Sequence, residues 1–417
     1  MNVFDKLFRG DKTIWCIFIA LCIISLLEVF SASSTIVYRQ QNHWGPIFRH
    51  AVFLMIGFGS VMFLQRIKTK YFSIALLILP ISWALLLITM AIGTDVNGAQ
   101  RWLGIGAFTI QPSEFAKLAL VGFVAFFLSK LKKDNESFIF KVLMAGILIT
   151  CALIVTENLS TAVLLFGVCY LMMFIGQIDL KRLGIVAGVI AISGLIFLAS
   201  LSLIPQDYLP DRFATWKARI ERHTTQDEAG SGAPSADYKI TDDNYQVSHA
   251  KIAIANGNII GLPGSGTERD FLPQAYSDFI FAIILEEMGL IGGLVTLLLY
   301  VALMIRAGML ASRCDRLFPR YLLLGCALII TVQALANMAV AVNLIPVTGQ
   351  PLPLISRGGT STIITCVYFG IILACSNAKE EEHEPVDESI ANIHYDYPEP
   401  GLTNPQLRYE TTDESNN

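Results

Sequence analysis

"TIWCIFIALCIISLLEVFS", which covers residues 13–31, is an almost unbroken apolar run near the start of the chain. A helix needs about 20 apolar residues to cross the hydrocarbon core of a bilayer. Because backbone polar groups in lipid must form hydrogen bonds within their own segment, such a run is expected to be helical. It lacks a small-residue cleavage site, so we predict a membrane-spanning helix and not a removable signal peptide.

Nine further apolar runs of similar length follow the first one along the chain. Of the 417 residues, 54% are hydrophobic and only 15% are charged, which is less charge than a soluble protein of this length carries. We therefore predict an all-α polytopic membrane protein with about ten transmembrane helices and one long extracytoplasmic loop. The predicted spans are 13–34, 49–65, 72–93, 114–130, 138–156, 159–177, 182–204, 277–306, 320–344 and 358–377.

Lysine and arginine gather in the short loops on one side of these spans, which predicts that this side and both chain ends are cytoplasmic. Residues 1–12 are basic, which predicts a short amphipathic segment on the inner leaflet. We predict that residues 205–273 form one large external loop, with ordered ends and a loose middle rich in Asp, Gly, Ser and Pro. Residues 379–417 are acidic and polar, which predicts a disordered tail after the membrane domain of residues 13–378.

Cysteine and histidine usage points to neither disulfides nor a metal centre. Seven of the eight cysteines lie in or beside apolar runs, and none lies in an external segment. Cysteines and histidines show no metal-ligand spacing, and no nucleotide-binding motif is present. We expect no resident cofactor and no nucleic-acid partner, while a divalent cation stays an open alternative.

The stretch "FLPQAYSDFIFAIILEEMGLIGG", residues 271–293, places three carboxylates at or inside the eighth span. Asp278 lies at the outer end and is either a helix N-cap or first-turn acid, or a general base shielded by neighbouring aromatic rings. In a continuous helix Glu286 would lie about 12 Å deeper and about 80° around the axis, with Glu287 on the opposite face. A carboxylate at that depth is functional unless it is paired inside the bundle, and for Glu287 we favour pairing.

A second charged cluster begins the fourth span, in "NGAQRWLGIGAFTIQPSEFAKLALV" from Asn97 to Val121. Glu114 occupies the third helical position after Gln111 and Pro112, a natural capping place. Lys117 lies one turn further on the same face. The two residues form either a cap with a local ion pair, or a site where Lys117 meets an anionic headgroup or phosphate at the membrane edge.

The third stretch, "PVTGQPLPLISRGGTST" from Pro346 to Thr362, is rich in proline and glycine. We predict an irregular loop that dips between the last two spans, and such backbone must be buried in protein or line a cavity. Ser356 and Arg357 come directly before the glycines that open the last helix. They predict either an anion site at a helix start or a plain turn with a snorkelling arginine.

These three stretches, in this order within ten spans, resemble the motifs of the SEDS family, and the resemblance covers nearly all of residues 10–378. The short basic start and "DRFATWKARIERH", residues 211–223, are most similar to the FtsW branch of the Bacteroidetes type, with RodA as the near relative. The chain departs from the family pattern at Arg357, where a tyrosine is usual, and at "TENLST", residues 156–161, in place of a "QPDLGT"-like stretch.

The resemblance implies a peptidoglycan glycosyltransferase of the bacterial inner membrane. Its substrate would be lipid II, a disaccharide-pentapeptide on undecaprenyl pyrophosphate. A sugar hydroxyl would attack an anomeric carbon while lipid pyrophosphate leaves, which needs a base and cationic groups. Asp278 matches the family's essential acid and is the expected catalytic residue. The substrate-binding candidates are Lys117, Glu114, Arg212, Lys251, Ser356, Arg357 and Glu286.

The resemblance also implies a class B penicillin-binding protein, a transpeptidase, as partner, together with other divisome proteins at the septum. Three alternatives stay open: a RodA-like elongation polymerase, a transporter that flips lipid II, and a scaffold that only recruits a synthase. A transporter needs ionisable groups near the midplane. Most charged candidates lie at the outer edge of the spans, which favours an enzyme over a transporter. Glu286, which is predicted to lie deeper, keeps the transporter as an alternative.

Overall fold

The structure is a computed structural model of the whole chain, which divides into Met1–Lys379 and Glu380–Asn417. The first unit contains every element discussed below. Arg212, the middle of the large loop, residues 1–6 and the tail from residue 378 lie outside the described residues. The structure describes residues 7–32, 45–96, 99–105, 108–203, 216–218, 245–262, 264, 266–268, 271–272, 277–357 and 359–377.

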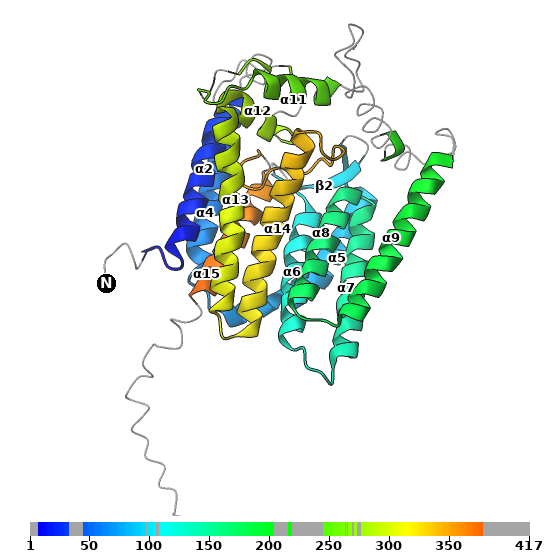
Figure 1. The fold of residues 1–417 in the computed structure, drawn as a ribbon. Helices are drawn as coiled ribbons and strands as arrows, with labels where there is room; N and C mark the ends of the chain where they lie inside the picture. The colour runs from blue at the N-terminus through cyan, green and yellow to red at the C-terminus, as the bar shows by residue number, and fades with distance from the viewer. Residues whose placement is uncertain are drawn as a thin grey trace, which may run out of the picture. The chain divides into compact units, whose positions relative to one another are not determined.

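Long apolar helices form the first unit, as predicted for a polytopic membrane protein (Figure 1). Within the described ranges, seven helices are long and apolar enough to cross a membrane, and three shorter apolar helices accompany them. These helices are α2 (Lys12–Ala32), α4 (Gly45–Leu64), α5 (Ala75–Ile92), α6 (Pro112–Ser129), α7 (Glu136–Val155), α8 (Leu159–Ile175), α9 (Leu180–Leu203), α13 (Gly289–Ser312), α14 (Leu317–Ala341) and α15 (Thr360–Ser376). Three shorter elements are the 3-10 helix η1 (Thr69–Ile74), α11 (Tyr245–Asn256) and α12 (Ile280–Glu287).

Helix α14 lies at the centre of the bundle, and α9 lies at its edge (Figure 1). In the most apolar 18-residue stretch of α14, 78% is buried inside the protein. The reason is that α6, α8, α13 and α15 all pack against α14. The corresponding share in α9 is 6%, and large apolar side chains such as Ile185 and Leu195 are exposed along it. In a membrane such side chains contact lipid, so exposure of this kind is expected on an outer helix.

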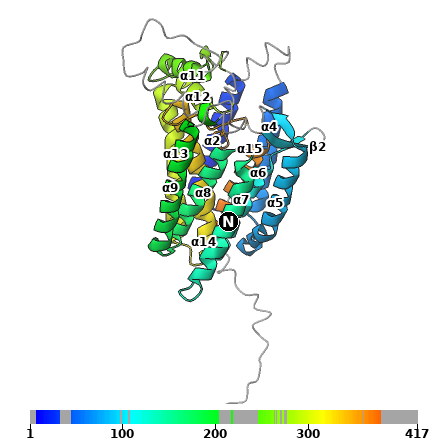
Figure 2. The ribbon, with the colours of Figure 1, turned by 90° about the vertical axis from the view of Figure 1, so that its right-hand side faces the viewer.

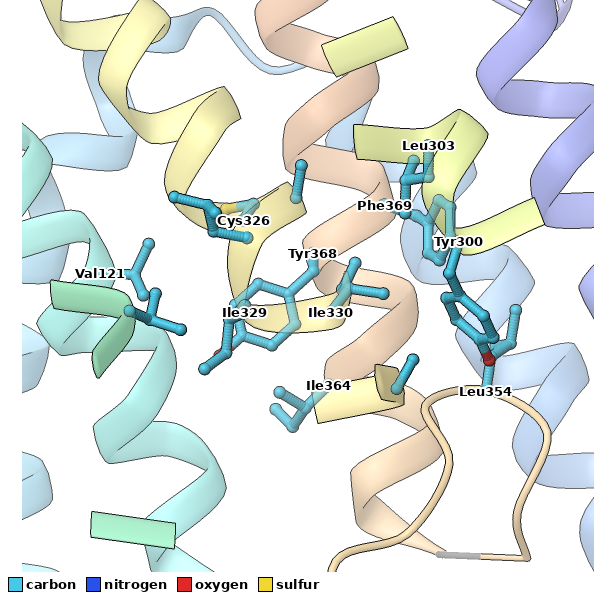
Figure 3. Packing of buried hydrophobic residues seen from close by; sticks show 14 of the residues in the cluster. Val121, Tyr300, Leu303, Cys326, Ile329, Ile330, Leu354, Ile364, Tyr368 and Phe369 are labelled. Carbon is cyan, nitrogen blue, oxygen red and sulfur yellow. The ribbon is translucent and has the colours of Figure 1, made fainter. Parts of the chain in front are cut away.

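The bundle interior is apolar and closely packed (Figure 3). Tyr300, Tyr368 and Phe369 are buried in it, on α13 and α15. Glycines permit close helix approach: a Cβ added at Gly325 of α14 would lie 2.6 Å from Met172 Cε of α8. Small residues at such contacts are typical of membrane helix packing, which depends on van der Waals contact between backbones.

The predicted eighth span is not one helix, and the prediction of a continuous helix over 277–306 is wrong. Helix α12 ends at Glu287, and α13 begins at Gly289, which has φ +72°. The amides of Leu290 and Ile291 donate to the carbonyls of Asn258 and Ile259 at 2.9 and 3.1 Å. The chain after α11 therefore caps α13, and Gly289 provides the left-handed backbone that the break needs.

A small antiparallel ribbon occupies part of the region that the sequence predicts as an external loop. Its strands, β1 (Thr94–Val96), β2 (Ala99–Ile105) and β3 (Phe108–Ile110), pair in the order β1-β2-β3. Figure 2 shows β2 beside the ends of α5 and α6, and both helices contact it. The ribbon thus returns the chain to Pro112, the first residue of α6.

The opposite end of the bundle is closed by an ion pair between the start of α2 and the end of α13. Arg306 Nε and Nη2 lie 3.0 and 2.5 Å from the two carboxylate oxygens of Asp11. The amide of Asp11 donates to Ser376 Oγ of α15 at 3.1 Å. Residues 7–11 are therefore tied to the bundle, and the membrane-surface role predicted for residues 1–12 stays a prediction.

Candidate active site

The candidate site is built around the segment from Asn343 to Gly359, which connects α14 to α15. As the sequence predicts, this irregular segment enters the protein interior: Leu352, Ile355 and Ser356 are all buried. Its carbonyl groups accept hydrogen bonds from side chains of the surrounding helices, as backbone inside a membrane protein requires. The pairs are Gln350 with Asn337 at 2.7 Å, Pro351 with Gln333 at 3.0 Å, Pro353 with Tyr300 at 2.5 Å, and Leu354 and Ile355 with Ser25 at 2.8 and 3.1 Å.

Leu354 has a left-handed backbone, with φ +70°. A non-glycine residue in that region is strained by about 1–2 kcal/mol. Ser25 donates to the carbonyl of Leu354, and Tyr300 donates to that of the preceding Pro353. The strained turn is therefore held by side chains of α2 and α13.

Asp278 lies in a turn, Ser277–Phe279, directly before α12. The N-cap position of α12 is Phe279, so the alternative of an N-cap or first-turn acid is wrong. The carboxylate is half-buried, and its Oδ1 accepts a hydrogen bond from the Ser277 hydroxyl at 2.9 Å. A Cβ added at Gly349 would lie 3.7 Å from Asp278 Oδ2, so the connecting segment lies against the acid.

Two buried side chains hold this turn against the segment. Asn337 Nδ2 donates to the carbonyl of Asp278 at 2.9 Å. Ser356 Oγ donates to the carbonyl of Ser277 at 2.6 Å and accepts from the amide of Leu352 at 2.8 Å. The Ser356 hydroxyl is thus engaged within the protein, and Arg357, which follows it, is half-buried.

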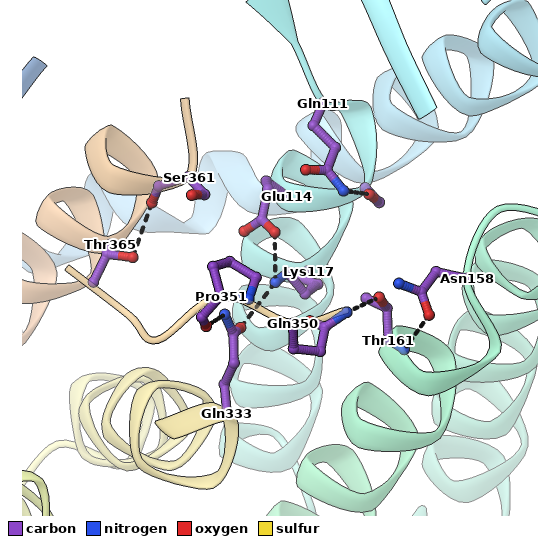
Figure 4. Close-up of polar contacts among 11 residues, drawn as sticks. Gln111, Glu114, Lys117, Asn158, Thr161, Gln333, Gln350, Pro351, Ser361 and Thr365 are labelled. Carbon is purple, nitrogen blue, oxygen red and sulfur yellow. Dashed lines mark hydrogen bonds and ion pairs between the residues drawn. The ribbon is translucent and has the colours of Figure 1, made fainter. Parts of the chain in front are cut away.

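Lys117 lies inside the bundle and not at its edge (Figure 4). It is 1% exposed, and its Nζ is 2.8 Å from Glu114 Oε1 and 3.0 Å from Gln333 Oε1. Glu114 occupies the third position of α6 after the N-cap Gln111, as predicted, although among the described residues no side-chain cap hydrogen bond forms at this N-cap. A buried ammonium needs a paired anion, and the local ion pair supplies it.

Glu286 and Glu287 both bind the returning end of the large loop. The amides of Thr267 and Glu268 donate to Glu286 Oε1 at 2.8 and 3.0 Å. Glu287 accepts from the amide of Gly264 at 2.7 Å and from the Ser31 hydroxyl. Because α12 ends at Glu287, the two acids lie before the long apolar helix α13 and not in the body of one continuous span.

Among the other candidates, Lys251 is exposed on α11, and Arg212 lies outside the described residues. Sequence reasoning missed Gln333 and Asn337, whose spacing of four within an apolar run is a detectable signal. It also missed Ser25, whose hydroxyl lies 2.8 Å from His50 Nε2. That contact joins α2 to α4, and no local pattern predicts it.

Comparisons with known proteins agree with this architecture. A family model described as "Cell cycle protein", for FtsW, RodA and SpoVE, matches residues 11–381. The probable peptidoglycan glycosyltransferase FtsW of Pseudomonas fluorescens (strain SBW25) is 31% identical over 367 residues, which cover 85% of this chain and 85% of that protein. Stage V sporulation protein E of Bacillus subtilis (strain 168) is 30% identical over 381 residues, which cover 88% and 96%.

Solved structures show the same fold. A chain from a structure titled "Structural coordination of polymerization and crosslinking by a peptidoglycan synthase complex" is 24% identical and has a TM-score of 0.71, with 90% of this chain and 99% of that chain covered. The rod shape determining protein RodA of Thermus thermophilus is 22% identical with a TM-score of 0.61, covering 88% and 97%. With the match to the family model, these likenesses confirm the resemblance to SEDS proteins: the chain is a polytopic membrane protein that belongs to the FtsW, RodA and SpoVE cell cycle protein family.

Proposed function

We propose that this chain is a peptidoglycan glycosyltransferase that polymerises lipid II at the outer face of the bacterial inner membrane during cell division. The name of the Pseudomonas fluorescens relative supports the activity, because the match covers 85% of both chains. The observation that carries the proposal is the position of Asp278. Its carboxylate is half-buried on a turn that Asn337 and Ser356 hold against an internal segment of the bundle.

In the proposed reaction Asp278 acts as the general base. It accepts the proton of a sugar hydroxyl on one lipid II as that oxygen bonds to the anomeric carbon of the other substrate. The bond from that carbon to the pyrophosphate oxygen breaks, and undecaprenyl pyrophosphate leaves with the electron pair. The hydrogen bond from Ser277 orients the carboxylate, and a base held in one orientation transfers protons efficiently.

Two cations near the site have different proposed roles. Arg357 lies near the end of the segment that carries Gly349 and Ser356, so it is our candidate for contact with the pyrophosphate. Lys117 is buried and paired with Glu114 and Gln333. Its proposed role is therefore structural and electrostatic: it fixes Glu114 and Gln333 in place, and it contributes positive charge to the site without contacting substrate. Arg212 and Lys251 stay candidates on the large loop.

The position of Glu286 argues against a transporter. The transporter alternative depends on an ionisable group near the midplane, and Glu286 instead lies before α13, where it binds loop amides. A scaffold alternative predicts that Asp278 has no chemical role. An enzyme is favoured because the buried side chains of Asn337 and Ser356 fix the main chain at Asp278 and Ser277. The carboxylate of Asp278 itself stays half-buried, so that substrate can reach it.

A class B penicillin-binding protein is the proposed partner, with other divisome proteins at the septum and both termini in the cytoplasm. The structure of a peptidoglycan synthase complex, whose title names polymerization and crosslinking, supports a transpeptidase partner. The exposed apolar surface of the bundle supports contact with membrane lipid. Division is favoured over elongation because the relative with 31% identity is named FtsW.

The test is polymerisation of purified lipid II by the full chain in detergent and in proteoliposomes, read as glycan strands on a gel. We expect polymer from the wild type and a loss of about 10²–10⁴-fold in rate with Asp278→Asn, which removes the base. Asp315→Asn is the matched control, because Asp315 is an exposed acid between α13 and α14. Wild-type rates from Asp278→Asn would exclude the base, and flipping of lipid II without polymer would favour the transporter.

A further inference from the structure

Two buried amides on α14 connect the ion pair of α6 to the turn that carries Asp278. Gln333 is 6% exposed and Asn337 is 1% exposed. They are four residues apart, so they lie on one face of the helix, one turn from each other. A buried amide costs stability unless it is hydrogen-bonded, and in a helix surrounded by apolar side chains such residues require a reason.

Asn337 joins two separate stretches of backbone. Its Nδ2 donates to the carbonyl of Asp278 at 2.9 Å and to the carbonyl of Gln350 at 2.7 Å. One amide group therefore fixes the distance between the acid's main chain and the internal segment. Because both acceptors are carbonyls, the two contacts also determine which way the side-chain amide points.

Gln333 makes the corresponding connection one turn away. Its Oε1 accepts from Lys117 Nζ at 3.0 Å, and its Nε2 donates to the carbonyl of Pro351 at 3.0 Å (Figure 4). Pro351 follows Gln350 directly, so the two amides bind consecutive carbonyls of one segment. A continuous path of contacts thus runs from Lys117 through this segment to Asp278.

We propose that Gln333 and Asn337 are positioning residues for glycosyl transfer, which fix Asp278 and Lys117 relative to each other through the carbonyls of Gln350 and Pro351. The proposal rests on the proposed function, because it assumes that Asp278 is the base. Neither amide contacts substrate in this scheme. Each affects the rate by fixing the position of Asp278 relative to Lys117. A displacement of about 1 Å can lower a rate about 100-fold.

The test uses shape-matched variants. Asn337→Leu removes both hydrogen bonds, and Gln333→Met removes the contacts to Lys117 and Pro351. We expect each to lower kcat for lipid II polymerisation by about 10–100-fold with KM within about 2-fold. Thr150→Val is the control: Thr150 is equally buried and accepts from Trp83 Nε1 at 2.9 Å, between α7 and α5. This control should keep wild-type kcat.

Gln333→Glu separates the two contacts of Gln333. It keeps an acceptor for Lys117 but loses the donor to the carbonyl of Pro351. If the effect passes through the segment, Gln333→Glu loses kcat as Gln333→Met does, and backbone amide exchange rises over residues 277–280 and 349–356. A wild-type kcat for Gln333→Glu would overturn the proposed connection through the carbonyl of Pro351. The proposal would also fail if Thr150→Val, at the same drop in unfolding temperature, lost as much kcat as the amide variants do.

Two further arms keep the result decisive. If Asn337→Leu fails to insert, Asn337→Gln retains the amide at the wrong reach and is expected to lose kcat by about 10-fold; wild-type kcat from it would overturn the positioning role. If Asp278→Asn is inactive while both amide variants are fully active, the positioning role is wrong and the proposed function stands. If Asp278→Asn is active, both are wrong.

Discussion

Lys117 Nζ lies 2.8 Å from Glu114 Oε1 on the first turns of α6, where both side chains are almost completely buried. Removal of one partner from a buried ion pair leaves a charge without compensation, which costs about 3–5 kcal/mol. We expect Lys117→Met and Glu114→Gln each to lower the unfolding temperature and the polymerisation rate. The double variant is expected to be no worse than the worse single one, because both changes break the same contact. Additive losses, measured by thermal unfolding and polymer yield, would show that the two side chains act separately.

Gly349 offers a second prediction, because its φ of +65° is available to few L-residues. Gly349→Ala is expected to lower stability by about 1–2 kcal/mol. It is also expected to lower the polymerisation rate more than that loss explains, since the added Cβ would make van der Waals contact with Asp278 Oδ2, at 3.7 Å, and occupy space beside the proposed base. Gly264→Ala is the control, since Gly264 has φ +87° and no atom of the described residues lies within 4 Å of an added Cβ. Equal rates for the two variants at equal stability would show that strain alone matters at Gly349.

The ion pair between Asp11 and Arg306 predicts a pH dependence of stability. Burial raises the pKa of Asp11, but hydrogen bonds from Arg306 and the Ile14 amide outweigh it and lower the pKa below 3.8. A carboxyl with a depressed pKa stabilises the folded state above its unfolded pKa, and this contribution is lost as pH falls through the folded pKa. The unfolding-temperature gap between the wild type and Asp11→Asn should therefore be constant from pH 7 to about 5. It should then shrink below about pH 4; a gap that grows on acidification would contradict the assignment.

Glu286 and Glu287 predict how the end of the large loop is held. Glu286→Ala should increase amide exchange at Thr267 and Glu268, because their hydrogen-bond acceptor is removed. Glu287→Ala should do the same at Gly264, which donates to Glu287 at 2.7 Å. Hydrogen–deuterium exchange over residues 257–268 measures both effects. Unchanged exchange in both variants would mean that other contacts fix this segment.

The spans could be predicted from the sequence because lipid imposes one rule on every residue that faces it. The fourth predicted span, 114–130, differs from α6 (Pro112–Ser129) only at its edges. The break at Gly289 could not be predicted in this way, since apolar residues flank Glu286, Glu287 and Gly289 on both sides and together are long enough for one span. Its cause is the chain at Asn258 and Ile259, which is far away in sequence and supplies the carbonyls that cap α13.

The site was predictable in its residue types and not in its contacts. Asp278 and the pair Glu114–Lys117 could be singled out as candidates because charged residues are conspicuous beside apolar runs. Gln333 contacts Lys117 across a sequence separation of 216 residues. Only the packing of α6 against α14 brings these two residues together, and no periodicity within either helix contains that information.

The internal segment between α14 and α15 also constrains the order of assembly in the cell. Five of its carbonyls, at residues 350, 351, 353, 354 and 355, accept hydrogen bonds from side chains of α2, α13 and α14. Until those helices have packed, this stretch must stay hydrated or bound to the insertion machinery, because unpaired backbone does not enter lipid. We therefore expect the turn that carries Asp278, which Asn337 and Ser356 hold, to reach its final position only after these helices have packed. Partly assembled chains are then expected to lack polymerisation activity.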